Sequence, residues 1–142
     1  MSSITYKQTQ TIIDATLAKG AEMGLKPLSV VVLDAGGHPL AFARQDGAAP
    51  GRFEIARGKA YGAVMLGMSG SAQMARAEAQ AYFMAAVNGA YGGKVIPVPG
   101  GILVKDDAGA VIGAVGVTGD TSDNDAEAGM AGLAAARLAG EA

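Results

Sequence analysis

The only histidine of the chain, His38, follows a glycine pair at 36–37 and precedes Pro39. Imidazole is a common ligand of haem iron and of other metal ions, but one histidine cannot build a multi-histidine zinc site within a chain. His38 is therefore either an exposed turn residue or an axial haem or metal ligand, which two subunits could share. Haem iron also accepts tyrosinate. The chain has four tyrosines: Tyr6, Tyr61, Tyr82 and Tyr91.

Three basic residues, Arg52, Arg57 and Lys59, gather where a second helix is expected to begin. Arg52 and Lys59 are seven residues apart, which places them on one helix face, two turns apart. Cations near a helix start oppose its dipole, so they need a compensating partner. They are solvated, they pair with carboxylates such as Glu54, or they bind an anionic ligand.

The segment from Pro97 to Gly101 combines two prolines with two adjacent glycines, Gly100 and Gly101. Prolines stiffen a segment, and glycines allow positive φ and a close approach of backbone to a ligand. Pro99, Gly100 and Gly101 therefore form either a rigid turn into the following strand or a ligand-binding loop.

A second loop, residues 116–122, joins a strand to the last helix and contains Thr118 and Asp120. The amides and dipole at a helix N-terminus attract anions. Here the chain's own acids, Asp120, Asp123, Asp125 and Glu127, already lie at that end. The loop is either a well-capped helix start or part of a ligand site, and a hard-cation site is a further alternative.

Hydrophobic patterning and turn residues predict the elements that must hold these side chains. Thr5 and Gln8 have capping-box spacing, and Gly24 before Pro27 ends the helix that they begin. An Asp-Ala-Gly sequence recurs at 34–36 and 107–109, between β-branched runs that predict two hairpins. The predicted elements are a helix from Tyr6, strands at 28–34 and 39–45, a helix at about 53–67, a helix capped by Ser71 to about Asn88, strands at 102–105 and 110–117, and a helix opened by Ser122 with Asp125 through Leu138.

The predicted order is helix, hairpin, helix, helix, hairpin, helix. Because hairpins favour antiparallel strands, this order indicates an α+β fold with a single antiparallel sheet flanked by helices. No long linker divides the sequence, so residues 1–142 are expected to form one domain. Much of the apolar content is alanine, which buries little area, so burial between subunits of a homo-oligomer would add stability.

Composition excludes several classes of function. The net charge is −2 with no basic run, which argues against a nucleic-acid partner. The chain has no cysteine, so it forms no disulfide, thiolate metal site or covalent C-x-x-C-H haem attachment. No apolar run approaches the roughly 20 residues that span a bilayer, and the N-terminus has no signal-peptide core. We therefore expect a cytoplasmic protein without a membrane partner.

The chain resembles the GlcG/HbpS family, which is also similar to the C-terminal domain of PduO-type proteins. The resemblance covers nearly the whole chain and is specific only when its motifs are taken together. These motifs are residues 31–38 (VVLDAGGH), Lys59-Ala60, residues 99–101 (PGG), residues 112–119 (IGAVGVTG) and the acidic residues 123–125 before the last helix. The Ala- and Met-rich segment 69–88 and the lack of a cysteine in the last helix depart from the common pattern.

The resemblance implies a profilin-like fold, self-assembly into homo-oligomers and, in some members, binding of haem or iron. The first hypothesis is therefore a small-ligand-binding protein, for haem, another tetrapyrrole or iron, with a carrier or sensory role. The ligand-binding candidates are Asp34, His38, Arg52, Lys59, Pro99, Gly100, Gly101, Thr118 and Asp120, with His38 as the metal ligand.

The alternative is a lyase, isomerase or hydratase for a small organic acid, in which Arg52 or Lys59 holds a carboxylate and Asp34 or Asp120 acts as base. A base of this kind works best with a raised pKa, in a partly buried position. A third hypothesis is a structural oligomer or partner module. The spacing of the residues assigns no catalytic group, so the sequence leaves open whether the protein is an enzyme.

Overall fold

A five-stranded antiparallel sheet lies at the centre of the structure, a computed structural model that describes residues 2–142. The strand order is β2-β1-β4-β3-β5, so β1 and β4 pair in the middle and neither hairpin is interrupted. The strands are β1 (Ser29–Asp34), β2 (Pro39–Arg44), β3 (Gly101–Lys105), β4 (Val111–Thr118) and β5 (Ala139–Glu141). The predicted α+β class with one helix-flanked antiparallel sheet is confirmed.

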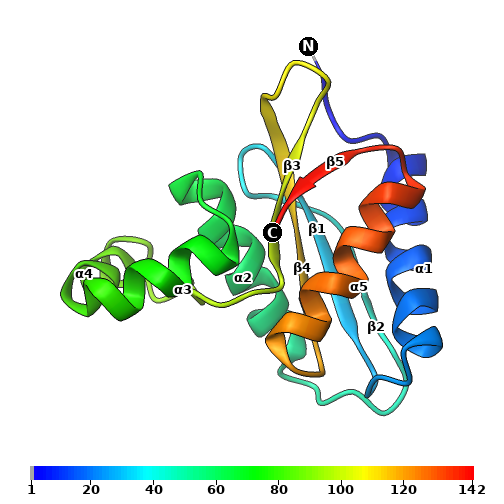
Figure 1. Ribbon diagram of the computed structural model, residues 1–142, viewed down its shortest axis with the longest axis horizontal. Helices are drawn as coiled ribbons and strands as arrows, with labels where there is room; N and C mark the ends of the chain where they lie inside the picture. The colour runs from blue at the N-terminus through cyan, green and yellow to red at the C-terminus, as the bar shows by residue number, and fades with distance from the viewer. Residues whose placement is uncertain (1) are drawn as a thin grey trace.

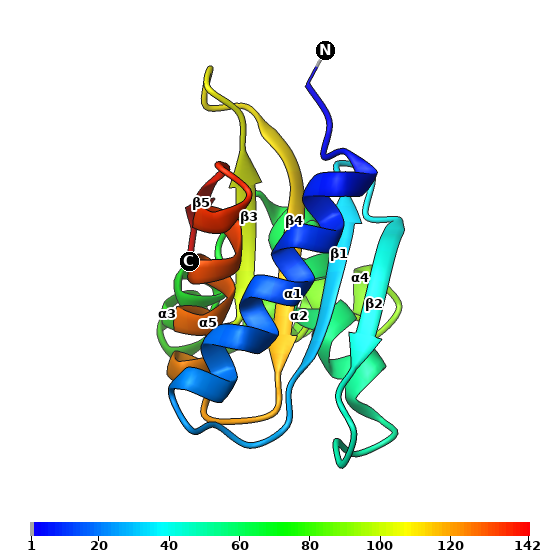
Figure 2. The same cartoon turned by 90° about the vertical axis from the view of Figure 1, so that its right-hand side faces the viewer.

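Helices cover both faces of this sheet (Figures 1 and 2). On one face α1 and α5 pack over a core that includes Ile12, Val30 and Leu133, and α2 packs on the other over Val31 and Leu103. Neighbouring strand residues point to opposite faces, so the Val30–Val31 pair supplies both cores. The helices are α1 (Tyr6–Glu22), α2 (Arg52–Leu66), α3 (Gly70–Ala79), α4 (Ala81–Ala90) and α5 (Ser122–Ala135).

The two hairpin turns are built alike, although the sequence repeat is offset from the structural one. In the first turn, Asp34 Oδ1 accepts hydrogen bonds from the amides two and four residues later, and Asp106 Oδ1 does the same in the second. Asp106 is therefore the equivalent of Asp34, whereas the Asp-Ala-Gly match pointed to Asp107. Each turn is held by the aspartate whose side chain accepts hydrogen bonds from the amides that follow it.

The segment after α2 differs from the prediction of one helix capped by Ser71. Ser69, which has extended backbone angles, is the N-cap and accepts from the Ala72 amide. The helix then breaks at Gln80 (φ −141°, ψ 65°), which separates α3 from α4. These helices form an arm that projects from the body in Figure 1, with its own small core around Met84, Val87 and Val95.

The last helix also differs from its prediction at both ends. Thr121, not Ser122, is the N-cap and accepts from the Asn124 amide. The helix ends at Ala135 rather than Leu138, because the chain reverses through Arg137 (φ 59°) and adds β5 beside β3. No helix found in residues 2–142 has the length and apolar character needed to cross a membrane.

Candidate functional site

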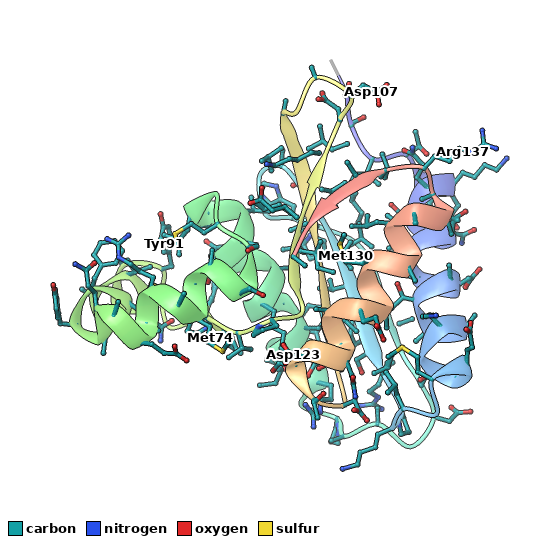
Figure 3. The ribbon with its side chains drawn as sticks, in the orientation of Figure 1. Met74, Tyr91, Asp107, Asp123, Met130 and Arg137 are labelled. Atoms are coloured by element: carbon teal, nitrogen blue, oxygen red, sulfur yellow. The ribbon has the colours of Figure 1, made fainter. Side chains whose placement is uncertain are left out.

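The antiparallel register separates the predicted site residues into two groups at opposite ends of the sheet. Ser29 pairs with Thr118, and Asp34 pairs with Gly113, so β1 runs from one group to the other. Five residue steps of extended chain place these ends about 17 Å apart. Figure 3 marks the two ends with Asp123, at the start of α5, and Asp107, in the turn between β3 and β4.

A buried ion pair lies at the end where β4 meets α5. Lys59 Nζ of α2 lies 3.1 Å from Asp125 Oδ2 of α5 and donates to the Val117 carbonyl oxygen at 2.9 Å. Only 4% of the Lys59 side chain and 1% of the Asp125 side chain are exposed. The ammonium was expected to be solvated, to pair with an acid such as Glu54 or to hold an anion. It pairs instead with Asp125, which lies 66 residues later in the sequence.

Burial sets the electrostatics of this pair. Desolvation lowers the pKa of Lys59 and raises that of Asp125, because the interior disfavours both charged forms, while their mutual attraction acts in the opposite direction. The second oxygen, Asp125 Oδ1, accepts the Asp120 amide at 2.9 Å. Both partners are thus hydrogen-bonded, which a buried ion pair requires in order to persist.

The glycines of the Pro-Gly-Gly segment pack against this lysine. A Cβ added to Gly100 (φ +107°) would lie 2.9 Å from Lys59 Nζ, and one added to Gly101 would collide with the Lys59 carbonyl oxygen. Pro99 and both glycines are buried, and the Gly100 carbonyl accepts the Val117 amide. The structure accounts for the glycines by close approach to α2, and their predicted role in ligand binding stays a prediction.

Arg52 and Asp120 lie beside the pair, nearer to solvent. Arg52 Nη1 donates to Thr118 Oγ1 at 2.8 Å. Asp120 accepts from the Lys26 amide, the Thr121 amide and the Asn124 side chain, and these bonds lower the pKa of Asp120 to about 2. A carboxylate held in this ionised form is a weak proton acceptor at neutral pH, which argues against Asp120 as a general base.

At the opposite end, Asp34 and His38 lie together in the first hairpin turn. The His38 side chain is 80% exposed, and its Nδ1 lies 3.4 Å from Asp34 Oδ1. Slight burial of Asp34 raises its pKa, but hydrogen bonds from the His38 and Gly36 amides and the His38 charge outweigh that effect, and the pKa falls below its usual value. Asp34 therefore also lacks the raised pKa that the enzyme hypothesis requires.

Two side chains of α2 contact this hairpin turn, and two residues that follow α4 contact one of them. A Cβ on Gly37 would lie 2.9 Å from Met65 Cε and 3.3 Å from Tyr61 Cε1, so the turn rests on α2. The Tyr61 and Tyr91 rings meet edge to face at 6.1 Å, and Lys94 Nζ lies 5.5 Å from the Tyr61 ring centroid. Figure 3 shows Tyr91 on the arm, near α2.

Sequence reasoning missed Asp125 as the partner of Lys59 and Tyr61 as a neighbour of the hairpin turn that carries His38. Asp125 was read as a helix cap because it follows Ser122 at cap spacing. No spacing signal could have found either contact, because both depend on how α2 lies across the sheet. Within residues 2–142, no three acidic or histidine side chains gather closely enough to hold a metal ion.

A family comparison decides the relationship. The model of a family described as haem degrading protein HbpS-like matches residues 4–134. The chain belongs to the HbpS-like family. The predicted resemblance to the GlcG/HbpS family is therefore confirmed over residues 4–134.

Solved structures resemble this HbpS-like chain over nearly its full length. A structure of HbpS is 29% identical with a TM-score of 0.80, and covers 94% of this chain and 90% of its own. The Klebsiella pneumoniae protein ORFY is 25% identical with a TM-score of 0.82, at 96% and 92% coverage. A PduOC:haem complex, at 21% identity, shares the fold with a TM-score of 0.86, at 97% and 98% coverage. No curated protein matches the sequence.

Proposed function

We propose that this protein binds haem at the exposed hairpin turn that carries His38, and that it serves as a haem carrier or sensor. Two relationships support a haem-related ligand. The family is described by haem degradation, and a protein of the same fold has been crystallised with haem. The observation that carries the proposal for this chain is the geometry of His38.

His38 is prepared to act as an axial ligand. Its Nδ1 lies 3.4 Å from the Asp34 carboxylate, which leaves Nε2 as the nitrogen available for iron. Metal-ligating histidines commonly donate their other ring N–H to a carboxylate, which fixes the tautomer and makes the ligand more basic. In the part of the chain that the structure describes, 80% of the His38 side chain is exposed, so the ring is open to a ligand.

The surroundings of His38 also fit the rest of a haem molecule, which is a flat apolar ring with two propionates. Met65 and Tyr61 offer apolar and aromatic surface beside the turn. Lys94 lies against Tyr61, and Arg57 lies one helical turn before Tyr61 on the same face of α2. These two cations are suited to the propionates. Bound haem would supply a redox-active iron and a visible absorption band.

A single chain provides only one side of such a site. Haem is best buried in a mostly apolar cleft, whereas His38 lies on an open surface. We therefore propose a homo-oligomer in which a second copy covers the haem. Exposed aromatic residues on the arm, Tyr82 and Phe83, favour association between copies. A cytoplasmic location stays a prediction from the sequence.

Titration of the purified protein with haemin tests the proposal. We expect a saturable shift of the Soret band, and His38→Ala should weaken binding at least about tenfold, because it removes the iron ligand. Asp34→Asn should weaken binding less, by about two- to tenfold, since it loosens the orientation of the ring without removing it. Asp14→Asn is the matched control, because Asp14 is an exposed acid on α1, on the other face of the sheet from α2, and this variant should bind as the unmodified protein does.

Two results would count against this assignment. A Soret spectrum that equals that of free haemin would exclude the haem site. Binding that survives His38→Ala but is lost in Tyr61→Phe would transfer the axial ligand to the neighbouring tyrosine. Size-exclusion chromatography with light scattering, with and without haemin, tests the homo-oligomer separately.

A further inference from the structure

A small cavity of about 240 Å³ opens at the end of the sheet opposite His38. Three loops form it: the loop before β1, the loop between β2 and α2, and the loop between β4 and α5. All three meet at the lower end of the molecule in Figure 1. The cavity is lined by two cations, Lys26 and Arg52, together with small residues that include Gly47, Ala48 and Gly119.

Both cations lack an acidic partner. The ion pairs found in residues 2–142 involve neither Lys26 nor Arg52. The one side-chain bond of Arg52, to Thr118 Oγ1, fixes the guanidinium in place without neutralising it. Arg52 is half-buried and lies at the first position of α2, where the helix dipole opposes a positive charge. After burial, the charge of Arg52 also contributes to the lowered pKa of Lys59, so the two cations lie close enough to repel each other.

Asp120 is a carboxylate close to Lys26, and its oxygens are already engaged. Asp120 Oδ1 accepts the Lys26 amide at 3.1 Å. Its Oδ2 accepts the Thr121 amide and the Asn124 side chain, both at 2.9 Å. The hydrogen bonds of Asp120 thus come from two backbone amides and the Asn124 side chain, and from neither cationic side chain. A chain with a net charge of −2 keeps two unpaired cations at one cavity.

The size of the cavity limits the ligand. Its volume corresponds to about eight water molecules at roughly 30 Å³ each, which suits a small ligand. Its remaining walls consist of the small residues Gly47, Ala48, Ala49 and Gly119 together with Pro27. At Gly119 the Pro27 carbonyl oxygen leaves no room for a Cβ. An ion with several equivalent oxygens matches a fixed guanidinium, which binds carboxylate or phosphate through two parallel hydrogen bonds.

We propose that this cavity binds a small oxyanion, a short carboxylic acid or a phosphate, through Arg52 with Lys26 at the rim. The site is independent of the proposed haem site, since the length of β1 separates them. Either site can therefore fail its test while the other passes.

NMR titration of the full chain with inorganic phosphate, and separately with acetate and succinate, tests the proposal. At constant ionic strength, with chloride as reference, we expect saturable shifts of the Gly47, Ala48 and Gly119 amides. Arg52→Gln should weaken binding at least about tenfold, since a hydrogen bond to a charged group contributes about 1.5–3 kcal/mol. Lys26→Gln, at the exposed rim, should weaken it about two- to fivefold. The better-bound probe identifies the oxyanion class.

Arg44→Gln is the matched control, because it removes one positive charge from exposed β2 next to the cavity. Binding should be unchanged in this variant. Shifts that never saturate, that chloride reproduces, or that respond to Arg44→Gln instead of Arg52→Gln would overturn the proposal. If Arg52→Gln does not fold, Thr118→Val releases the guanidinium without removing it and should weaken binding about threefold or more.

Discussion

The two ends of the sheet differ in how their charged side chains are satisfied. At one end, Lys59 and Asp125 are buried, and the Lys59 ammonium and both Asp125 carboxylate oxygens have hydrogen-bond partners inside the protein. At the other end, His38 is exposed and holds one partner, Asp34, at its own turn. The buried pair therefore links α2, β4 and α5, and we call the Lys59–Asp125 pair the brace. The exposed His38 ring, in contrast, has a nitrogen free to bind a ligand, as proposed above.

The largest expected effect comes from breaking the brace. Asp125→Ala should lower the free energy of unfolding by about 3–5 kcal/mol, because it leaves the Lys59 ammonium buried without a counter-charge. Lys59→Met combined with Asp125→Ala removes the stranded charge and should recover at least half of that loss. Urea denaturation followed by circular dichroism measures both.

His38→Ala is the matched change at the other end and sharpens the comparison. It removes an exposed side chain, so the free energy of unfolding should stay within about 0.5 kcal/mol of the unmodified value. If Asp125→Ala cost no more than His38→Ala, the contrast between a brace and an open ligand would be wrong.

A glycine beside the brace should show the next largest effect. Gly101→Ala would push a Cβ against the Lys59 backbone, which cannot move away without disturbing the pair, and should cost about 1–3 kcal/mol. Gly89→Ala in α4 is the control, since a Cβ there meets nothing within 4 Å. It should raise stability by up to about 1 kcal/mol through helix propensity. Equal effects would show that the segment around Gly101 can relax.

Signals between residues close in the sequence predicted most of the fold. The site was harder to predict, because it depends on contacts between residues far apart in the sequence. The Thr5–Gln8 capping box and the hairpin turns act within four residues, so the sequence alone could reveal them. The break at Gln80 has no glycine or proline to announce it. Strand β5 is three residues long and exists only because the chain returns to β3.

The candidate residues were recognised one by one, and the structure shows which of them lie together. The Pro-Gly-Gly segment, the Arg52–Lys59 face and the start of α5 converge. Asp34 and His38 do not join them, because the antiparallel register of β1 and β4 carries them to the far end. The candidate residues at the two ends of β1 could be assigned to separate sites only once the pairing of β1 with β4 was known.

The smallest effect concerns the acid that lies between the brace and solvent. Hydrogen bonds from Asn124, Thr121 and Lys26 lower the pKa of Asp120 to about 2 in the folded chain, below its ordinary value of 3.8. The folded state therefore binds this proton less readily than the unfolded state. The stabilisation is fully present above pH 4 and is lost as the pH falls towards 2. Urea unfolding measured across this range should show stability declining with acidity.

Asp120→Asn removes that titration and should flatten the decline. Asp107→Asn is the matched control, because Asp107 is an exposed acid in the turn at the other end of the sheet. It should leave the slope unchanged. A slope that responds equally to both substitutions would mean that general charge repulsion causes the acid sensitivity. In that case the hydrogen bonds of Asp120, which join the loop before β1 to the start of α5, would not be the cause of the loss of stability in acid.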